Sequence, residues 1–470
     1  MRGASRPTAA VAAGLALAAG LAVATAGCGG GGEGAPTDAA PPAPAETITV
    51  SVRDGDTGAP VAGARVIAFR GRTPIARAVA DDAGRAALPW NTRYAEARAS
   101  GLTPGRTKVG TGATVVEMYD PARQSPEYGG GPARARTVSA VDVGPPDGRP
   151  RWRFTSRTLL EFPPAVADGL VVVGTNSGRV YAMDGDTGAL RWARRLRGEI
   201  ASSPAIDGER VIVSSMGGLL RAYGVNGGTV RWTYDTGSPI ESSPLVVGGI
   251  VYVGAWNGGL YAVDARTGAL RWRFQAGADI KGSAALAGGR IVFGDYGGRV
   301  YAVDPRNGAL RWSSAAGQRF YGGPGVSGDT VVIGDVGGSV VALDAATGAV
   351  RWRHAAGGYV YSSPAIAGGT VFIGSYAGRF EALDLATGAL RWSFAAGERI
   401  SGSATVVGDV VYTAVLARPG APRRTYGLDV GTGAVRFRAD EGRYSPVVAA
   451  GVTLYLVGTR TIEAYRDRAP

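Results

Sequence analysis

The segment Leu260–Trp272, with the sequence LYAVDARTGALRW, contains the pattern that decides the fold. Its first five residues have the composition of a β-strand, Asp264 to Gly268 has the Asp-x-x-Thr-Gly composition of a tight turn, and Leu270 opens a second strand. The Arg-Trp pair at its end recurs every 40 residues. The pair occupies positions 151–152, 191–192, 231–232, 271–272, 311–312, 351–352 and 391–392, and Arg436-Phe437 follows 45 residues after the last pair.

Each 40-residue unit contains four short β-rich runs. In the unit around this segment they are Ile240–Val246, Ile250–Gly254, Leu260–Asp264 and Leu270–Phe274, separated by turn residues. A period near 40 with four strands per unit is typical of β-propeller blades, because each small sheet needs neighbours to cover its faces. The 76 glycines, which follow no G-X-Y period, agree with many tight turns. The sequence therefore predicts an all-β fold of four-stranded blades.

The number of blades depends on how the ends of the repeat meet. Sets of the first three strands occur eight times, the last being Tyr444–Val448, Thr453–Val457 and Ile462–Tyr465. This set lacks a fourth strand, whereas Arg151–Thr155 is a fourth strand with no blade before it. We therefore expect these two parts to pair and close an eight-bladed ring. The strand-like piece Thr137–Val143 keeps seven blades as the alternative.

The repeated turn carries a family resemblance. The pattern Ala262-x-Asp264-x-x-Thr267-Gly268-x-x-x-Trp272-x-x-x-x-Gly277 resembles the tryptophan-docking motif of the PQQ-like (pyrroloquinoline-quinone-type) β-propeller family. The resemblance implies that each Trp fills the space between neighbouring blades, while Asp and Thr-Gly satisfy backbone groups of the turn. The expected structural docking residues are Trp152, Trp192, Trp232, Trp272, Trp312, Trp352 and Trp392.

The same family includes quinoprotein alcohol and glucose dehydrogenases, so a PQQ-dependent dehydrogenase is one alternative. Many of those enzymes have an adjacent cysteine pair over the quinone and acidic and amide ligands for calcium, whereas Cys28 is the only cysteine here. The only histidine, His354, occupies a position that other units fill with phenylalanine. One histidine builds no multi-histidine metal site, and a Ser-His-Asp triad at this position is disfavoured. We expect no catalytic residues, no metal and no cofactor.

The N-terminus has the features of an export signal. Arg2 and Arg6 precede an apolar stretch from Val11 to Ala24, and the segment closes on Thr25-Ala26-Gly27-Cys28. This closure resembles the bacterial lipobox, although Thr25 departs from the usual leucine. We expect a lipoprotein signal peptide at 1–27 and lipidation of Cys28, with ordinary secretion as the alternative. Residues 28–46, rich in Gly, Pro and Ala, are expected to form a flexible tether.

A small β domain is expected at residues 47–120. The run from Val52 to Val66 and the turn around Asp81-Asp82 resemble the carboxypeptidase-regulatory-like β-sandwich module of exported bacterial proteins. Asp54 and Asp56 have a D-x-D spacing, but the later ligands of a calcium loop are missing, which favours turn chemistry. Residues 121–136 are interpreted as a linker, and 137–470 as the PQQ-like propeller.

One face of the propeller is the expected binding surface. The strand order brings the loops before each first strand to the same face as the loops between second and third strands. Residues in these loops change from unit to unit, so the fold does not require them, and large aromatic side chains beside charges resemble a contact surface. The candidates are Glu161, Glu241, Lys281, Arg319, Tyr321, Tyr361, Arg399, Trp256, Tyr296 and Tyr376.

The net charge and the composition limit the classes of binding partner that we expect. Of the basic residues behind the net charge of +12, all but Lys108 and Lys281 are arginine, and no arginine-rich run is interleaved with aromatics, so we expect no nucleic acid. We expect an exported, monomeric scaffold, anchored by lipid on the outer face of the cytoplasmic membrane or cell envelope, that binds an envelope protein. In layout it is similar to the lipoprotein of the outer-membrane β-barrel assembly machine. A propeller that binds cell wall or polysaccharide is the second alternative.

Overall fold

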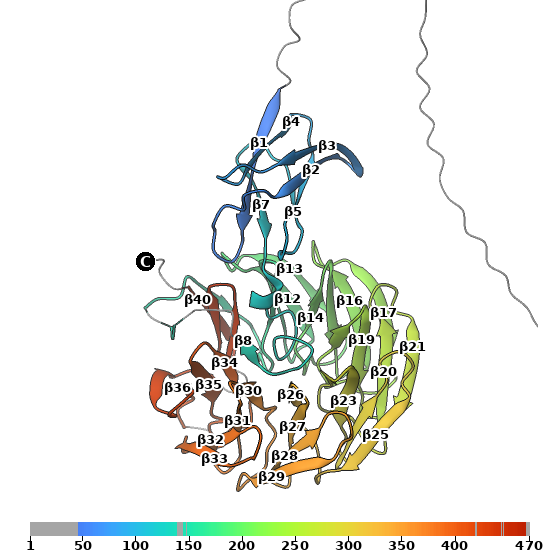
Figure 1. The fold of residues 1–470 in the computed structure, drawn as a ribbon, viewed down its shortest axis with the longest axis vertical. Helices are drawn as coiled ribbons and strands as arrows, with labels where there is room; N and C mark the ends of the chain where they lie inside the picture. Colours follow the sequence, from blue (N-terminus) through green and yellow to red (C-terminus); the bar gives the residue numbers. More distant parts are fainter. Residues whose placement is uncertain are drawn as a thin grey trace, which may run out of the picture. The chain divides into compact units, whose positions relative to one another are not determined.

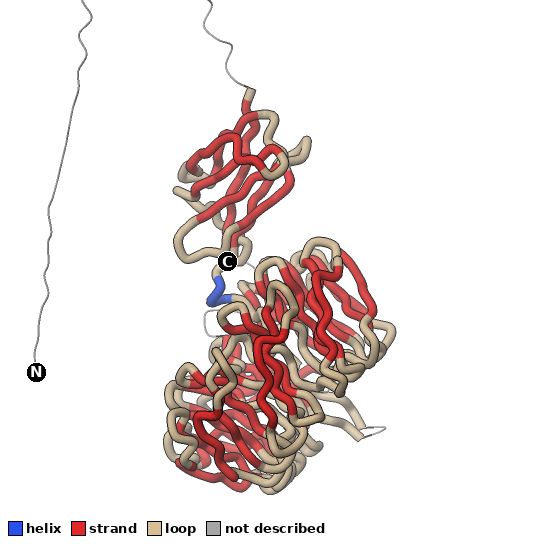
Figure 2. Tube along the Cα trace, turned by 90° about the vertical axis from the view of Figure 1, so that its right-hand side faces the viewer, coloured by secondary structure: helices blue, strands red, loops and turns tan. Residues whose placement is uncertain are grey.

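The computed structural model describes residues 46–138, 144–146, 148–418, 421–442, 444 and 446–466 (Figure 1). The expected signal peptide, Cys28 and all of the expected tether except Glu46 lie outside these residues. Within the described part, every regular element is a strand except the single 3₁₀ turn η1 (Pro121–Arg123) (Figure 2). The described residues include no helix long and apolar enough to span a membrane.

Residues 47–118 form two sheets. One sheet has the order β4-β1-β7 and the other β3-β2-β5-β6. The strands are β1 (Thr47–Asp54), β2 (Arg65–Arg70), β3 (Thr73–Val79), β4 (Arg85–Pro89), β5 (Tyr94–Arg98), β6 (Gly105–Lys108) and β7 (Thr114–Met118). Alternate residues such as Val50, Val52, Val66 and Val116 are fully buried in one hydrophobic cluster, as the period of a strand requires. Asp54 Oδ1 accepts hydrogen bonds from the backbone N–H groups of Asp56 and Thr57, so this side chain stabilises the turn.

The propeller begins with six antiparallel four-stranded sheets, each in sequence order. Blades 1 and 2 are β10 (Ala165–Ala167), β11 (Leu170–Gly174), β12 (Arg179–Asp184), β13 (Leu190–Arg195), then β14 (Ala205–Asp207), β15 (Arg210–Ser214), β16 (Leu219–Gly224), β17 (Val230–Asp235). Blades 3 and 4 are β18 (Leu245–Val247), β19 (Ile250–Gly254), β20 (Gly259–Asp264), β21 (Leu270–Gln275), then β22 (Ala285–Ala287), β23 (Arg290–Gly294), β24 (Arg299–Val303), β25 (Leu310–Ala315). Blades 5 and 6 are β26 (Gly325–Ser327), β27 (Thr330–Gly334), β28 (Ser339–Asp344), β29 (Val350–Ala355), then β30 (Ala365–Ala367), β31 (Thr370–Gly374), β32 (Arg379–Asp384), β33 (Leu390–Ala395).

Two further sheets complete the ring. Blade 7 contains β34 (Thr405–Val407), β35 (Val410–Ala414), β36 (Thr425–Asp429) and β37 (Val435–Ala439). Blade 8 contains β38 (Val447–Ala450), β39 (Thr453–Val457), β40 (Thr461–Arg466) and β9 (Trp152–Thr155). β9 pairs with β40, opposite Ala464 and Ile462, which is the expected closure of the two ends. β38 in turn contacts β10, so the described sheets agree with an eight-bladed ring.

The docking tryptophans lie between blades. Trp352 of β29 donates a hydrogen bond from Nε1 to the carbonyl of Leu385, one blade further on, at 2.9 Å. The other six make the equivalent bond at 2.8–3.0 Å. The Thr-Gly turn needs its glycine for two reasons. Gly388 has a φ of +74°, and a Cβ there would lie 2.6 Å from Cε3 of Trp352.

The aspartate of each turn holds the turn and the following arginine. Asp264 Oδ1 accepts hydrogen bonds from the backbone and the hydroxyl of Thr267, both at 2.8 Å. Arg271 Nη2 donates to Asp264 Oδ2 at 2.6 Å. The Arg271 bond, followed by the Thr267 hydroxyl, holds the pKa of Asp264 well below its ordinary value. The motif of the sequence is therefore structural at every step.

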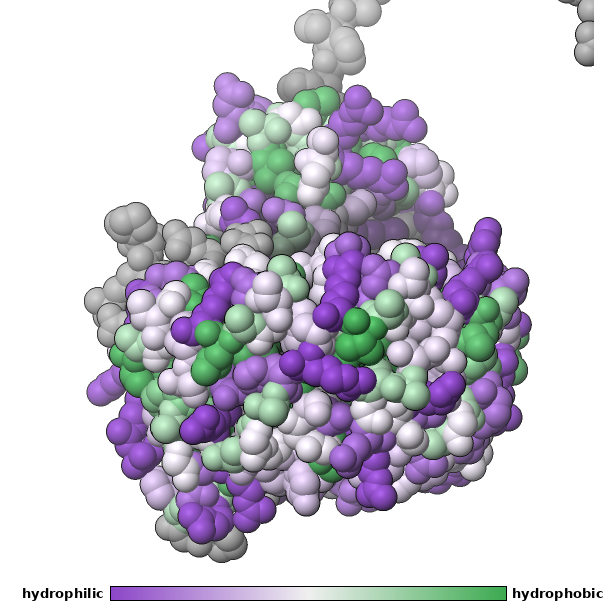
Figure 3. Space-filling model, turned by 60° about the horizontal axis from the view of Figure 1, so that its bottom comes forward, coloured by the Kyte–Doolittle hydropathy of each residue, from purple (hydrophilic) through white to green (hydrophobic). Residues whose placement is uncertain are grey.

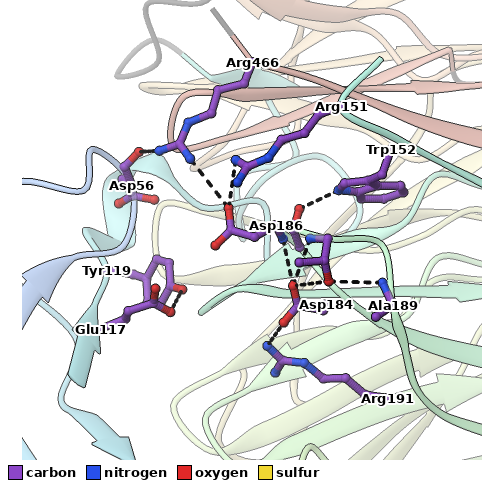
Figure 4. Close-up of polar contacts among 12 residues, drawn as sticks. Asp56, Glu117, Tyr119, Arg151, Trp152, Asp184, Asp186, Ala189, Arg191 and Arg466 are labelled. Atoms are coloured by element: carbon purple, nitrogen blue, oxygen red, sulfur yellow. Dashed lines mark hydrogen bonds and ion pairs between the residues drawn. The ribbon is translucent and has the colours of Figure 1, made fainter. Parts of the chain in front are cut away.

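Phe437 replaces the docking Trp in blade 7. β40 and β9 of blade 8 come from opposite ends of the propeller sequence, so no turn joins these two strands, and the residues after β40 lie outside the described part. At the end of β40, Arg466 donates to the backbone carbonyl of Asp56 at 3.0 Å and lies 3.6 Å from Asp186 of blade 1, which also pairs with Arg151 (Figure 4). The strand that closes the ring thus also contacts the β-sandwich.

The expected linker is bound inside the propeller. Residues 121–138, here called the channel segment, accept hydrogen bonds from the innermost strand of one blade after another. The acceptors are the carbonyls of Ser125, Pro126, Pro132, Ala133, Ala135 and Arg136, and the donors are the backbone N–H groups of Val166, Ile206, Leu286, Val326, Ile366 and Val406. Glu127 Oε2 accepts from Val246, and Ser125 Oγ donates to Ala449 of blade 8. All eight blades therefore contact this segment.

The end of the channel segment is also the piece that left the blade count open. Thr137–Val138 forms β8, which pairs in parallel with β34 on the inner edge of blade 7. It is not the third strand of another blade, and residues 139–143 lie outside the described part. The backbone of the segment is held by hydrogen bonds to the inner strands of the blades.

Candidate binding site at the channel mouth

Two sets of loops form the mouth of the channel. The backbone N–H of Trp256, in the loop between second and third strands, donates to the carbonyl of Pro239 before the first strand at 3.0 Å. Tyr296 and Tyr376 make the same bond to Asp279 and Tyr359 at 2.8 and 2.9 Å. The bond recurs because each blade has the same strand order, and it joins the loops that carry the candidate residues.

The mouth is a funnel that encloses about 620 Å³, including open solvent. Of the ten candidate residues, Glu161, Glu241, Lys281, Tyr321 and Tyr361 line it. Each comes from a different blade. Glu241, Lys281, Tyr321 and Tyr361 come from four consecutive blades, 3 to 6, and form one side of the lining, whereas Glu161 comes from blade 1.

Glu241 is the centre of this side. Its Oε1 accepts a hydrogen bond from the Tyr321 hydroxyl, and its Oε2 accepts one from Trp256 Nε1 at 3.1 Å. Burial raises the pKa of Glu241, although Tyr321, Lys281 and Trp256 partly offset this effect. Burial also raises the pKa of Tyr321, and the nearby carboxylate adds to the shift. The hydrogen bonds hold two aromatic rings around one carboxylate.

A row of tyrosines continues from this centre. The rings of Tyr321 and Tyr361 lie 5.0 Å apart edge to face, and those of Tyr361 and Tyr376 lie 4.8 Å apart. Tyr359 contacts both Tyr361 and Tyr376 and is 54% exposed. Such contacts fix large amphipathic rings before any partner arrives, which reduces the entropy lost on binding.

Three cations lie over these rings. Lys281 Nζ lies 4.2 Å from the centre of the Trp256 ring and 4.3 Å from that of Tyr296. The guanidinium groups of Arg319 and Arg399 lie 5.4 Å above Tyr296 and 5.7 Å above Tyr376. All ten candidate residues of the sequence therefore belong to the mouth, five in the funnel and five around it.

The floor of the funnel comes from a residue that the sequence did not suggest. Tyr128 of the channel segment lines the funnel, and its hydroxyl hydrogen-bonds to Ser403 at 2.9 Å and to Ser363 at 3.2 Å. Phe162 and Tyr444 are two further lining residues. These two stand at the first serine of the Ser-Ser-Pro pattern of other units, so their departure from serine was a usable signal. Tyr128 gave none, since it lies outside the repeat.

The channel segment below the funnel is held by buried charge. Arg134 is 1% exposed and donates to the carbonyls of Pro244 at 2.8 Å, Ala284 at 3.1 Å and Tyr128. Its guanidinium lies 3.8 Å from the buried carboxylate of Glu127. Burial raises the pKa of Glu127, while Arg134 lowers it. The channel is therefore occupied by the chain itself beneath the mouth.

The histidine of the chain lies between two blades. His354 of β29 lies 3.1 Å from the buried Glu381 of the next blade, a contact between blades. Among the described residues, no group of three or more His, Cys, Asp or Glu side chains is placed to hold a metal ion.

The family of the chain follows from a match over most of its propeller. The model of the family described as outer membrane protein assembly factor BamB matches residues 134–273, 211–320 and 296–461. This chain belongs to that family. The matched ranges begin within the channel segment and extend into β40, so they cover the blades and the mouth. No curated protein matches the chain.

Solved structures share the fold at low sequence identity. BamB from Moraxella catarrhalis superposes with a TM-score of 0.57 at 17% identity, covering 67% of this chain and 98% of that one. A europium-containing methanol dehydrogenase gives 0.62 at 14% identity, covering 71% and 89%. The quinohemoprotein alcohol dehydrogenase from Comamonas testosteroni gives 0.60 at 14%, covering 74% and 82%. These similarities show a PQQ-like propeller fold that serves both an assembly factor and enzymes.

Proposed function

We propose that this protein is a non-enzymatic scaffold of the cell envelope that binds a protein partner at the channel mouth. The observation that carries the proposal is the fixed cluster of Glu241, Trp256, Lys281, Tyr321 and Tyr361, which combines rigid aromatic rings with charge. Tyrosine, tryptophan and arginine are the residues that most often dominate protein interfaces. Membership in the BamB family supports a scaffold role.

The funnel is a poor match for the quinone of the related dehydrogenases. PQQ carries three carboxylates, whereas the charged residues that line the funnel are two glutamates and one lysine. The path along the axis is filled by Tyr128, Glu127 and Arg134. Because an anionic cofactor would meet a net negative lining, we derive no reaction step through it.

The proposal includes export and anchoring. Lipidation of Cys28 would hold the chain at a membrane surface, and residues 29–45 would separate it from that surface. The carboxypeptidase-regulatory-like module would serve as a spacer. Its position is set by contacts such as that between Thr103 Oγ1 and Asp168 Oδ1, at 3.0 Å.

The test is the double variant Trp256→Ala/Tyr296→Ala. Partner recovery after crosslinking in cells should fall at least tenfold, because the two rings that hold Lys281 are removed. Trp90→Ala is the matched control, since Trp90 is 64% exposed and lies in the β-sandwich. Unchanged recovery from the double variant would remove the mouth from consideration.

A polysaccharide ligand is the second candidate, favoured by the tyrosine row from Tyr321 to Tyr376. Glycan-array binding that disappears in Tyr361→Ala would support it over a protein partner.

A further inference from the structure

The channel segment leaves one buried positive charge without a carboxylate partner. Arg136 is 2% exposed, like Arg134, but the only carboxylate in the segment between Ser125 and Val138 is Glu127, which pairs with Arg134. Tyr128 faces Arg136 through its ring, whose centre lies 4.6 Å from the guanidinium carbon. Two arginines and one glutamate give this part of the channel an excess of one positive charge.

The guanidinium of Arg136 is only partly hydrogen-bonded. Nε donates to the carbonyl of Ala404 at 2.5 Å, and Nη2 donates to Ser403 at 3.3 Å and to Thr405 Oγ1 at 3.2 Å. Nη1 is buried and has no hydrogen-bond partner. An arginine does not lose its proton in a protein, so the buried positive charge of Arg136 has to be balanced by another group.

A cavity adjoins this arginine. It has a volume of about 310 Å³, including open solvent, and Arg136, Thr405, Ser125 and Gly130 are among the residues that line it. Thr405 Oγ1 accepts from Arg136, so its own hydrogen is available to a ligand. The cavity therefore presents a cation and a hydroxyl donor, whereas the carboxylate of Glu127, which also lines it, is engaged by Arg134 and by the backbone of Val246.

We propose that this cavity is a binding site for one small monovalent inorganic anion, such as chloride, held by Arg136 Nη1 and the Thr405 hydroxyl. A monovalent anion neutralises the single excess charge, and Arg136 Nη1 and the Thr405 hydroxyl together supply donors for one such ion. The anion would then be a structural part of the channel, linking the channel segment to blade 7. This cavity shares Tyr128 with the mouth but none of the ten candidate binding residues lines it, and the proposal does not depend on the proposed function.

The test compares anions at equal ionic strength. The melting temperature of the purified chain should rise with chloride and bromide relative to gluconate, a bulky organic anion, because a ligand that binds only the folded state stabilises it. Arg136→Gln should lose this response. Arg299→Gln should keep it, since Arg299 is an exposed position of β24 and does not line the cavity.

Two measurements guard against a variant that fails to fold. Thr405→Val keeps the shape of the side chain and should weaken the chloride response at least threefold in midpoint concentration. Crystals grown in bromide should show an anomalous peak within hydrogen-bond distance of Arg136 Nη1. Equal melting temperatures in chloride and gluconate, or a water at Nη1 without an anomalous peak, would overturn the proposal.

Discussion

Replacing Arg134 with Met tests whether the channel segment holds the blades together. Met keeps much of the buried stem but removes the donors to Pro244, Ala284 and Tyr128, and the cation beside Glu127. Removing one partner of a buried ion pair costs about 3–5 kcal/mol, mainly because the remaining group stays buried without its partner. We expect a loss of that size in the free energy of unfolding, measured by guanidinium denaturation.

The same variant should change the dependence of stability on pH. Without Arg134, the pKa of Glu127 rises further above its ordinary value, because burial is no longer offset by the cation. A carboxylate whose pKa is raised in the folded state keeps full stability below its unfolded pKa and loses it as the pH rises through the folded value. The stability of Arg134→Met relative to the parent chain should therefore be highest in acid and should fall as the pH rises toward neutral.

Two further variants make this test specific. Adding Glu127→Gln to Arg134→Met should recover about 1–3 kcal/mol, because the two side chains are coupled. Arg299→Met, at an exposed position of β24, should change stability by less than about 0.5 kcal/mol. A loss below about 1 kcal/mol in Arg134→Met, with no change in pH dependence, would refute the role given to the channel segment.

Three other predictions concern the blades. Gly388→Ala should lower the free energy of unfolding, measured by thermal denaturation, by about 3 kcal/mol or more, because the new Cβ meets the Trp352 ring. Gly369→Ala is the control: its φ is similar, +69°, but no atom lies near the new Cβ, so the loss should be only about 1 kcal/mol. Trp312→Phe should lower the free energy of unfolding by about 1–3 kcal/mol, since the carbonyl of Ala345 loses its donor. Arg391 and Thr387 hold the pKa of Asp384 at about 2, so the stability from this group is present above its ordinary pKa and is lost as the pH falls toward 2. In Asp384→Asn, the melting temperature should fall less between neutral pH and pH 2 than in the parent chain, and an equal fall in both would contradict this prediction.

The blades could be predicted because equivalent residues in each 40-residue unit make the same contacts. The unit around Trp272 was enough to assign the strands, the turn and the docking residue of the other units. The last unit lacks a fourth strand, and this indicated that it pairs with Arg151–Thr155. The mouth followed from strand order, since residues such as Glu241 and Tyr321 vary at a position that the fold leaves free.

The channel segment was not predictable in the same way. Its Gly, Pro and Arg composition describes local conformations and says nothing of where the backbone hydrogen bonds go. Arginine is rarely buried, so Arg134 and Arg136 give no sign of burial, and both adopt a positive φ, of 55° and 54°, that sequence rules assign to glycine. Their environment is built by carbonyls from blades more than a hundred residues away, such as Pro244 and Ala404.

Exposed hydrophobic residues on the rest of the propeller differ from those at the mouth, which distinguishes the mouth from other possible binding surfaces. One exposed aliphatic residue precedes the Arg-Trp or Arg-Phe pair in most blades, as at Leu190, Leu270 and Leu390. On the face shown in Figure 3, hydrophobic residues form small patches separated by hydrophilic ones. Scattered single residues of this kind are normal for a protein surface. The mouth differs because its aromatic side chains contact one another.

The most direct measurement places a photocrosslinking amino acid at position 359 of the chain in living cells. Tyr359 is exposed at the mouth, and Glu209 is exposed on the turn at the other end of β14, so position 209 is the matched control. A protein partner at the mouth should be crosslinked from position 359, not from position 209, and should be lost in Trp256→Ala/Tyr296→Ala. The same protein captured from both positions, or from position 209 alone, would contradict a binding site at the mouth.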